Sequence, residues 1–202
     1  MTETIIVVDI ETTGLSPDRG ARATEVAAVK ICDQRVVDTF HSLMNAGVSV
    51  PPEIQLLTGI TNAMVRGAPP SRQVMARLSD FIGDDSLVAH NASFDSRFLA
   101  SEFVISGIPY KARFACTMQL ARRVYPNAPN HKLETLLDYA AIPNAGRFHR
   151  ALADAMATAD LLIHMQRDLC NRHGLSRLNH EQLCTLSRTP VASVAKKLSS
   201  WR

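Results

Sequence analysis

The sequence lacks any apolar run long enough to cross a membrane. No stretch of its 202 residues approaches the roughly 20 consecutive apolar residues that span a bilayer. The N-terminus also has no basic segment of the kind that opens a signal peptide, and Asp9 and Glu11 interrupt the first apolar run. With 46% hydrophobic and 20% charged residues, the composition is typical of a soluble globular protein. We therefore expect a core-forming protein without a membrane span or signal peptide.

Paired cysteines are absent too. The four cysteines lie far apart and form no C-x-x-C pair: Cys32, Cys116, Cys170 and Cys184. This spacing argues against a zinc site and favours a reduced, cytoplasmic setting in which the thiols pack as small apolar side chains.

Internal repeats and low-complexity segments are also lacking, but the charge is unevenly distributed. The net charge is +3, yet residues 165–202 alone carry seven Lys or Arg against two acids. A basic end on a slightly acidic body indicates a polyanionic partner, with a merely solvated tail as the alternative. We therefore divide the chain into a main domain, residues 1–173, and a basic helical C-terminal appendage, residues 174–202.

Apolar patterning predicts an α/β fold. Strands are expected over residues 4–10, 24–32, 35–42, 86–91 and 113–117. Helices are expected over residues 71–82, 93–104, 117–124, 132–140 and 150–170. Three strands followed by alternating helices and strands indicate a mixed sheet with helices packed on it.

Polar residues and prolines mark the expected helix starts. Ser71 is predicted to cap the helix that follows it, and Asn91 or Ser93 to cap the next one. Thr189 and Pro190 form a predicted cap and first-turn pair for a last short helix.

Two carboxylates close the first predicted strand, in "TIIVVDIETTGL" (residues 4–15). Alternate strand residues share a face, so Asp9 and Glu11 should project the same way, ~7 Å apart. They lie at the C-terminal strand end, where open α/β sheets bind ligands. Buried together they would take up protons unless a cation compensates them. A frayed strand end with both acids in water is the alternative.

A third carboxylate, Asp95, follows "SLVAHN" at another C-terminal strand edge. Helix capping and the helix dipole explain an acid in that first helical turn equally well. A fourth, Asp154, lies in "HRALADAMATADLLIHMQ", whose two apolar stripes predict a helix packed on both sides. One stripe joins Asp154 to Leu161 and Met165, where an uncompensated carboxylate is costly. A helix edge that leaves Asp154 in water is the alternative.

Three distant segments thus offer carboxylates that could converge, and divalent cations would neutralise them. Oxygen-only ligands favour Mg²⁺ or Mn²⁺. Two such ions ~4 Å apart are the arrangement that activates water and stabilises the leaving oxygen in phosphodiester cleavage. His149, five residues before Asp154, is the candidate base. We expect Arg147, Arg150 and bound cations to favour its neutral, proton-accepting form, although an ordinary surface histidine is the alternative.

Three motifs, "DIETTG", "HNASFD" and "HRALAD", occur in this order, with "LLTGIT" at residues 56–61. Together they resemble the motifs of the DEDDh family of 3′→5′ exonucleases, above all the exonuclease domain of the bacterial DNA polymerase III epsilon (proofreading) subunit. The resemblance covers about residues 4–165. It implies an α/β, ribonuclease H-like fold with a five-stranded mixed sheet flanked by helices. It also implies two Mg²⁺ or Mn²⁺ ions held by Asp9, Glu11, Asp95 and Asp154, with His149 as general base.

The resemblance further implies contacts with the 3′-terminal nucleotide. The candidate residues are Thr12, Thr13, Gly14, Leu15, Thr58, Gly59, His90, Asn91 and Phe94. Stacking on apolar or aromatic side chains would tolerate any base, and a packing role is the alternative for each residue. Thr24 departs from the family, where an apolar residue is common, so the packing of the second strand is less clearly specified.

The implied activity is metal-dependent release of nucleoside 5′-monophosphates from 3′ ends of single-stranded or frayed nucleic acid, with single-stranded DNA favoured over RNA. An RNA-trimming exoribonuclease of the same family is one alternative, since contacts with the 2′-hydroxyl decide that choice. A non-catalytic polymerase-accessory module is another. The basic appendage offers a contact for a polymerase or repair partner, and small relatives make a homodimer a further hypothesis.

Overall fold

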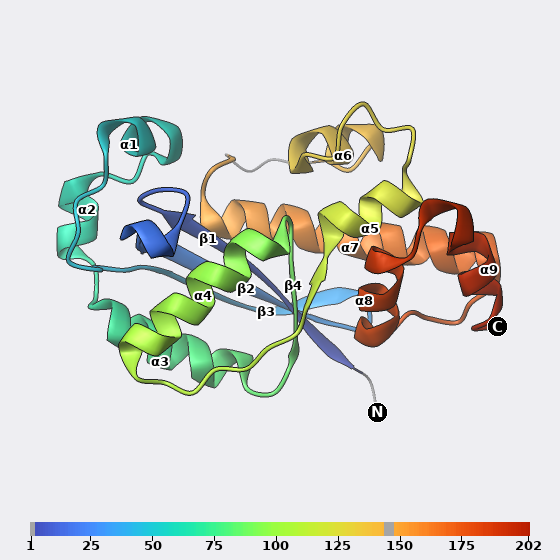
Figure 1. Cartoon of the computed structure of the whole chain (residues 1–202), viewed down its shortest axis with the longest axis horizontal. Helices are drawn as coiled ribbons and strands as arrows, with labels where there is room; N and C mark the ends of the chain where they lie inside the picture. Colours follow the sequence, from blue (N-terminus) through green and yellow to red (C-terminus); the bar gives the residue numbers. More distant parts are fainter. Residues whose placement is uncertain (1–2, 144–147) are drawn as a thin grey trace.

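A five-stranded mixed sheet forms the centre of the computed structural model, which describes residues 3–143 and 148–202 (Figure 1). In sheet order the strands are β3 (Arg35–Leu43), β2 (Ala23–Cys32), β1 (Thr4–Thr12), β4 (Ser86–Ala89) and β5 (Phe114–Cys116). The β1–β2 and β2–β3 pairs are antiparallel, whereas β4 pairs in parallel with β1 and with β5. The predicted α/β class and mixed five-stranded sheet are confirmed.

Helices cover both faces of this sheet. One face carries α3 (Ser71–Ile82) and α4 (Ala92–Ser106), and the other carries α7 (Ala151–His173), with α5 (Thr117–Val124) and α6 (Leu133–Tyr139) beyond it. Short elements lie at the two ends of the molecule in Figure 1: α1 (Pro52–Thr58) and α2 (Asn62–Gly67) at one, and α8 (His180–Arg188) and α9 (Val194–Ser199) at the other. The 3₁₀ turns are η1 (Pro17–Arg19) and η2 (Val191–Ser193).

The alternation of β1 feeds two separate cores. Ile5 and Val7 belong to the cluster under α7, whereas Ile6 and Val8 belong to the cluster under α3 and α4. Because side chains two residues apart share a face, Asp9 and Glu11 continue the α7 side of β1. The strand therefore delivers both carboxylates to the face on which α7 begins.

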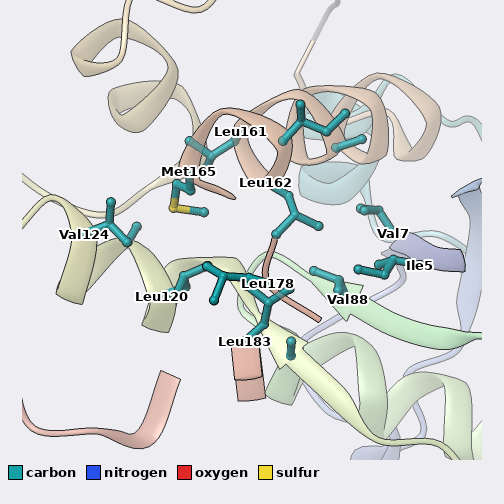
Figure 2. Close-up of a cluster of buried hydrophobic side chains, with 14 of the residues drawn as sticks. Ile5, Val7, Val88, Leu120, Val124, Leu161, Leu162, Met165, Leu178 and Leu183 are labelled. Carbon is teal, nitrogen blue, oxygen red and sulfur yellow. The ribbon is translucent and has the colours of Figure 1, made fainter. Parts of the chain in front are cut away.

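The helix α7 is packed on two sides, as its apolar stripes predict. Leu162 of α7 points toward the sheet residues Val7 and Val88. Met165, also of α7, points toward Val124 of α5 (Figure 2). Leu161 is likewise fully buried, and Asp160 is exposed. This double packing holds the helix firmly over the sheet, so its first turn has a defined position relative to β1.

The C-terminal residues pack into the same core. Gly174 ends α7 in the left-handed conformation (φ 64°), and α8 then contacts β5 and α5. Leu178 and Leu183 are buried in the cluster beneath α7 (Figure 2), and buried His180 donates from Nε2 to the Leu87 carbonyl at 2.8 Å. The predicted division after residue 173, where α7 ends, stays a prediction. Among the described residues, none of the helices has the length and apolarity of a membrane span.

Three predicted caps are not found as expected. The carbonyl of Pro70 accepts the N–H groups of Gln73 and Val74, so Pro70 is the N-cap and Ser71 is already helical. Asn91 is the N-cap of α4, but its left-handed backbone (φ 67°) leaves its side chain without a capping hydrogen bond.

The third difference concerns the predicted pair Thr189–Pro190. The Thr189 N–H donates to the carbonyls of Thr185 and Leu186, so Thr189 closes α8 rather than opening a helix. Pro190 then precedes η2. Thr24, whose packing was in question, is buried at the irregularity of the β1–β2 ladder, and β2 is nevertheless continuous.

Candidate active site

Carboxylates from two elements meet at the C-terminal end of β1. Asp9 and Glu11 from β1 and Asp154 from α7 each offer an oxygen, and these atoms all lie within 4.8 Å of one another. Asp95, in the first turn of α4, is 3% exposed and lies outside this group of atoms, but its charge raises the pKa of Asp9. Parallel pairing of β4 with β1 accounts for its proximity, because it places the start of α4 beside the end of β1.

The four carboxyl groups all have raised pKa values. Burial raises the pKa of Glu11 from 4.5 to about 7, with the charges of Asp154 and Glu25 adding to the effect. Burial raises the pKa of Asp95 from 3.8 to about 8 against hydrogen bonds from its own backbone and that of Ile10. Burial and then the charges of Asp95, Asp154 and Glu11 raise the pKa of Asp9 well above its ordinary value.

Asp154 shows how the cluster could accommodate a cation. Burial raises its pKa, and its Oδ2 accepts the backbone N–H of His149 at 3.0 Å. Its Oδ1 is buried with no hydrogen-bond partner within the described part of the protein. A buried, unsatisfied carboxylate oxygen is costly, and a cation removes that cost. The all-carboxylate donor set therefore fits Mg²⁺ or Mn²⁺.

His149 lies at the edge of this cluster. Its backbone is left-handed (φ 62°), and the residue is exposed. Its backbone N–H donates to Asp154 Oδ2. Of the two arginines expected to act on it, Arg147 lies outside the described residues. Arg150 donates to Glu25, with its Nη2 at 2.6 Å from Oε1. The exposed residue is therefore joined to the carboxylate cluster through its backbone.

The predicted contacts after β1 divide into loop-forming and exposed residues. Buried Thr12 donates its hydroxyl to the Gly14 carbonyl at 2.6 Å, and Thr13 Oγ1 accepts the Arg22 N–H at 3.0 Å. Both hydroxyls therefore shape the β1–β2 loop. Leu15, at the tip of the loop, is 84% exposed and is free to meet a nucleotide.

The "LLTGIT" segment divides in the same way. Thr58 is 1% exposed, donating its hydroxyl to the Ile54 carbonyl and accepting the Ile60 N–H, and Gly59 ends α1 at φ 74°. The exposed apolar groups of this segment are Leu56 and Leu57. Leu56 is not among the residues expected from the sequence to contact a nucleotide, and its exposure is visible only in the structure.

In the "HNASFD" segment, both ring nitrogens of the histidine have hydrogen-bond partners within the protein. Both nitrogens of His90 lie at hydrogen-bond distance from protein atoms, Nδ1 from Thr117 Oγ1 at 2.9 Å and Nε2 from the His131 carbonyl at 3.0 Å. Burial lowers the pKa of His90 to about 4, so the ring is neutral. Asn91 is exposed, and half-buried Phe94 packs on Phe98 with ring centroids 4.9 Å apart.

A cavity of about 620 Å³ adjoins the β1–β2 loop, and sequence reasoning did not find it. Among its lining residues are Leu15, Arg19, Val48 and Arg97. Within the described part of the chain, neither guanidinium has a carboxylate oxygen within 4.0 Å. Apolar and cationic groups together form a surface suited to nucleic acid.

Comparisons with known proteins agree with this geometry. A family model described as Exonuclease (RNase_T) matches residues 6–162. The chain is 37% identical over 164 residues to the DNA polymerase III PolC-type of Caldanaerobacter subterraneus, covering 81% of this chain but only 12% of that protein. The chain therefore spans about an eighth of the length of this relative.

Two solved structures have the same fold. One is Exonuclease X in complex with 5′ overhanging duplex DNA (TM-score 0.71, 28% identity, 91% of this chain and 99% of that chain). The other is the nuclease domain of 3′hExo, a DEDDh family member, bound to rAMP (TM-score 0.74, 21% identity, covering 89% of this chain and 98% of that chain). The family match covers most of the chain and includes all four carboxylates, so this protein belongs to the Exonuclease family.

Proposed function

We propose that the protein is a two-metal 3′→5′ exonuclease that hydrolyses the terminal phosphodiester bond of single-stranded or frayed DNA and releases nucleoside 5′-monophosphates. The observation that carries the proposal is the gathering of uncompensated carboxylates at one end of β1, including the orphaned Oδ1 of Asp154. Asp9, Glu11, Asp95 and Asp154 would hold the ions. When bound, Mg²⁺ or Mn²⁺ supplies the positive charge that stabilises the phosphoryl group and the leaving oxygen.

The protein's own residues would divide the remaining work. His149 accepts a proton from the attacking water at its exposed ring. Its backbone bond to Asp154 keeps the base beside the carboxylates during this transfer. Leu15, Leu56 and Leu57 offer exposed apolar surface against which a terminal base can pack without sequence preference.

The nucleotides that precede the terminal one would lie in the cavity next to Leu15. Arg19 and Arg97 in its lining would contact phosphates of the nucleotides that precede the terminal one. DNA is the proposed substrate because Exonuclease X, the solved structure 28% identical to this chain, was determined in complex with DNA. The exonuclease bound to rAMP supports only the shared fold, so RNA enters as the second arm of the test.

The experiment uses 5′-labelled DNA and RNA oligomers with Mg²⁺, Mn²⁺ or EDTA, beside the Asp9→Ala variant. The proposal expects a metal-dependent ladder that shortens from the 3′ end of DNA and is absent in the variant. A ladder on RNA alone would reassign the substrate. No cleavage of either oligomer with either metal would reject the enzyme and favour an accessory nucleic-acid-binding module.

Location and partners belong to the same proposal. The four cysteines are free thiols, and we place the protein in the cytoplasm, where thiols remain reduced. Arg177, Arg188, Lys196 and Arg202 are exposed on the C-terminal segment and would contact a polymerase, a repair partner or the nucleic acid. Gel filtration with light scattering tests the homodimer.

A further inference from the structure

Two buried glutamates outside the metal-binding set hold the two segments on which the proposed chemistry depends. Glu25, on β2, is fully buried, and Glu102, on α4, is 1% exposed. Each accepts hydrogen bonds from an arginine and from the backbone N–H of the alanine that follows it. Arg150 and Ala151 form this pair for Glu25, and Arg22 and Ala23 form it for Glu102.

Glu25 fastens the start of α7 to the sheet. Arg150 Nη2 lies 2.6 Å from Oε1, and the Ala151 N–H donates to Oε2 at 2.9 Å. The Ala151 N–H is one of the donors that a helix leaves unpaired at its first turn, and Arg150 provides no side-chain cap. Glu25 therefore caps α7 from the neighbouring strand. His41 also donates to Glu25, with its Nε2 at 2.8 Å from Glu25 Oε1.

This attachment determines where His149 and Asp154 stand. Both lie within four residues of Arg150. They are also joined to each other, because the His149 N–H donates to Asp154 Oδ2. Without Glu25, the turn before α7 loses its bonds to the sheet that carries Asp9 and Glu11. The oxygens of Glu25 are occupied by nitrogen donors, so it serves as an anchor and not as a further metal ligand.

Glu102 fastens a different segment, the β1–β2 loop. Arg22 donates to its two oxygens from Nε at 2.8 Å and Nη2 at 2.9 Å, in the bidentate geometry typical of strong arginine–carboxylate pairs. Two hydrogen bonds then join Arg22 to Thr13. The Thr13 N–H donates to the Arg22 carbonyl at 2.9 Å, and the Arg22 N–H donates to Thr13 Oγ1 at 3.0 Å. The loop that presents Gly14 and Leu15 is therefore held at its base.

We propose that Glu25 and Glu102 are positioning residues with separate roles: Glu25 fixes the catalytic side of α7, and Glu102 fixes the nucleotide-binding loop. The inference rests on the proposed exonuclease function. It predicts that loss of Glu25 impairs turnover and metal binding, whereas loss of Glu102 impairs substrate binding.

The first test compares steady-state kinetics of Glu25→Gln and Glu102→Gln on a 5′-labelled DNA oligomer with Mg²⁺. Loss of a residue that supports metal ligands typically costs about 10–100-fold, so Glu25→Gln should lower kcat by that factor with little change in KM. Glu102→Gln should raise KM on the order of 10-fold with little change in kcat. Asp168→Asn, which breaks the ion pair with Arg172 farther along α7, should change neither.

The second test does not depend on activity. Calorimetric titration with Mn²⁺ alone should show weaker binding to Glu25→Gln, by on the order of 10-fold, and unchanged binding to Glu102→Gln. Titration with thymidine 5′-monophosphate in the presence of Mn²⁺ should show weaker binding to Glu102→Gln. A merely structural role would lower the melting temperatures and leave these affinities unchanged.

Milder variants cover the case in which a glutamine variant does not fold. His41→Leu removes one donor to Glu25, and Arg22→Lys keeps the charge opposite Glu102 but loses the bidentate geometry. Equal changes of kcat and KM in both glutamine variants, or full Mn²⁺ affinity in Glu25→Gln, would overturn the inference. Failure of the unaltered chain to cleave would reject the proposed function instead, and the Mn²⁺ titration would still decide the role of Glu25.

Discussion

Glu11 and Glu25 are direct partners in the antiparallel β1–β2 ladder, and their carboxyl groups have opposite pKa shifts. Burial and nearby carboxylates raise the pKa of Glu11 to about 7. Burial also acts to raise the pKa of Glu25, but hydrogen bonds from Arg150, His41 and Ala151 outweigh it and hold that pKa below its ordinary value. Two identical side chains on one sheet face are thereby distinguished: Glu25 is hydrogen-bonded to Arg150, His41 and Ala151, whereas Glu11 lies beside other carboxylates.

The raised pKa values predict that the metal-free protein loses stability as the pH rises. An acid with a higher pKa in the folded state stabilises the fold while it is protonated. That contribution declines between its ordinary pKa and its raised pKa. The pH range of this decline runs from 4.5 to about 7 for Glu11 and from 3.8 to about 8 for Asp95, which are their ordinary and raised pKa values. In EDTA, the melting temperature should fall from pH 5 to pH 8, and Mg²⁺ should restore it more at pH 8 than at pH 5. An unchanged melting temperature across this range would contradict the raised values.

Replacing Asp9 should separate stability from activity. Asp9→Asn replaces one buried carboxyl group in a cluster of mutually repelling carboxylates by a neutral amide, so its melting temperature in EDTA at pH 8 should exceed that of the unaltered protein. Exonuclease activity should fall by more than the roughly 100-fold typical of residues that only support a metal ligand. Asp160→Asn, which alters an exposed acid of α7, is the control and should retain activity. A less stable Asp9→Asn protein would argue against repulsion in the cluster.

Replacing His149 should impair chemistry without harming the fold. His149→Ala removes the proposed base, and kcat should fall by about 10²–10⁴-fold. Because the residue is exposed, the free energy of unfolding should change by no more than about 0.5 kcal/mol. Single-turnover rates and thermal melts measure the two effects. His164→Ala, at a half-buried position on α7, is the matched control, and an equal loss of rate there would refute the assignment.

The cavity arginines should contribute to the salt dependence of binding. Each phosphate contact to a single strand contributes about −0.7 to the slope of log affinity against log salt concentration. Arg19→Gln and Arg97→Gln should each reduce the slope by about that amount, and the double variant by the sum. Fluorescence anisotropy with a DNA oligomer in Ca²⁺ or EDTA measures it without cleavage. Arg72→Gln, on an exposed part of α3, should leave the slope unchanged.

The C-terminal helices should be needed for stability. Leu183 of α8 is fully buried in the core under α7, and Leu183→Ala should lower the free energy of unfolding by about 2–5 kcal/mol. Thermal melts check this, with exposed Val191→Ala as the control. A melt close to that of the unaltered protein would mean that α8 is dispensable, so that truncation after residue 173 becomes a clean test of the basic segment.

Several features of the site were accessible from the sequence because they depend on local periodicity. Alternation along a strand places Asp9 and Glu11 on one face, and helical spacing places Asp154 on a stripe with Leu161 and Met165. Cap positions were less accessible. Ser71, Asn91 and Thr189 are all good capping residues by type, but backbone conformation and the preceding helix decided which residue was used.

The proposed roles of Glu25, Arg19 and Arg97 were beyond local reasoning. Glu25 reads only as an acid in the apolar strand "ATEVAAV", and its partner Arg150 lies 125 residues away. Arg22 and Glu102 are 80 residues apart. No periodic pattern connects such positions, because the pairing arises only when α7 and α4 pack on opposite faces of the sheet.

The sequence alone therefore determined the α/β order of elements, the family motifs and the four carboxylates, since each follows from residue type at short spacing. Tertiary structure decided which acids are compensated and which are not. That distinction depends on burial and on nitrogen donors brought from distant segments. Glu11 and Glu25 are chemically the same residue in the sequence, and only the packing of Arg150, His41 and Ala151 around one of them makes it an anchor.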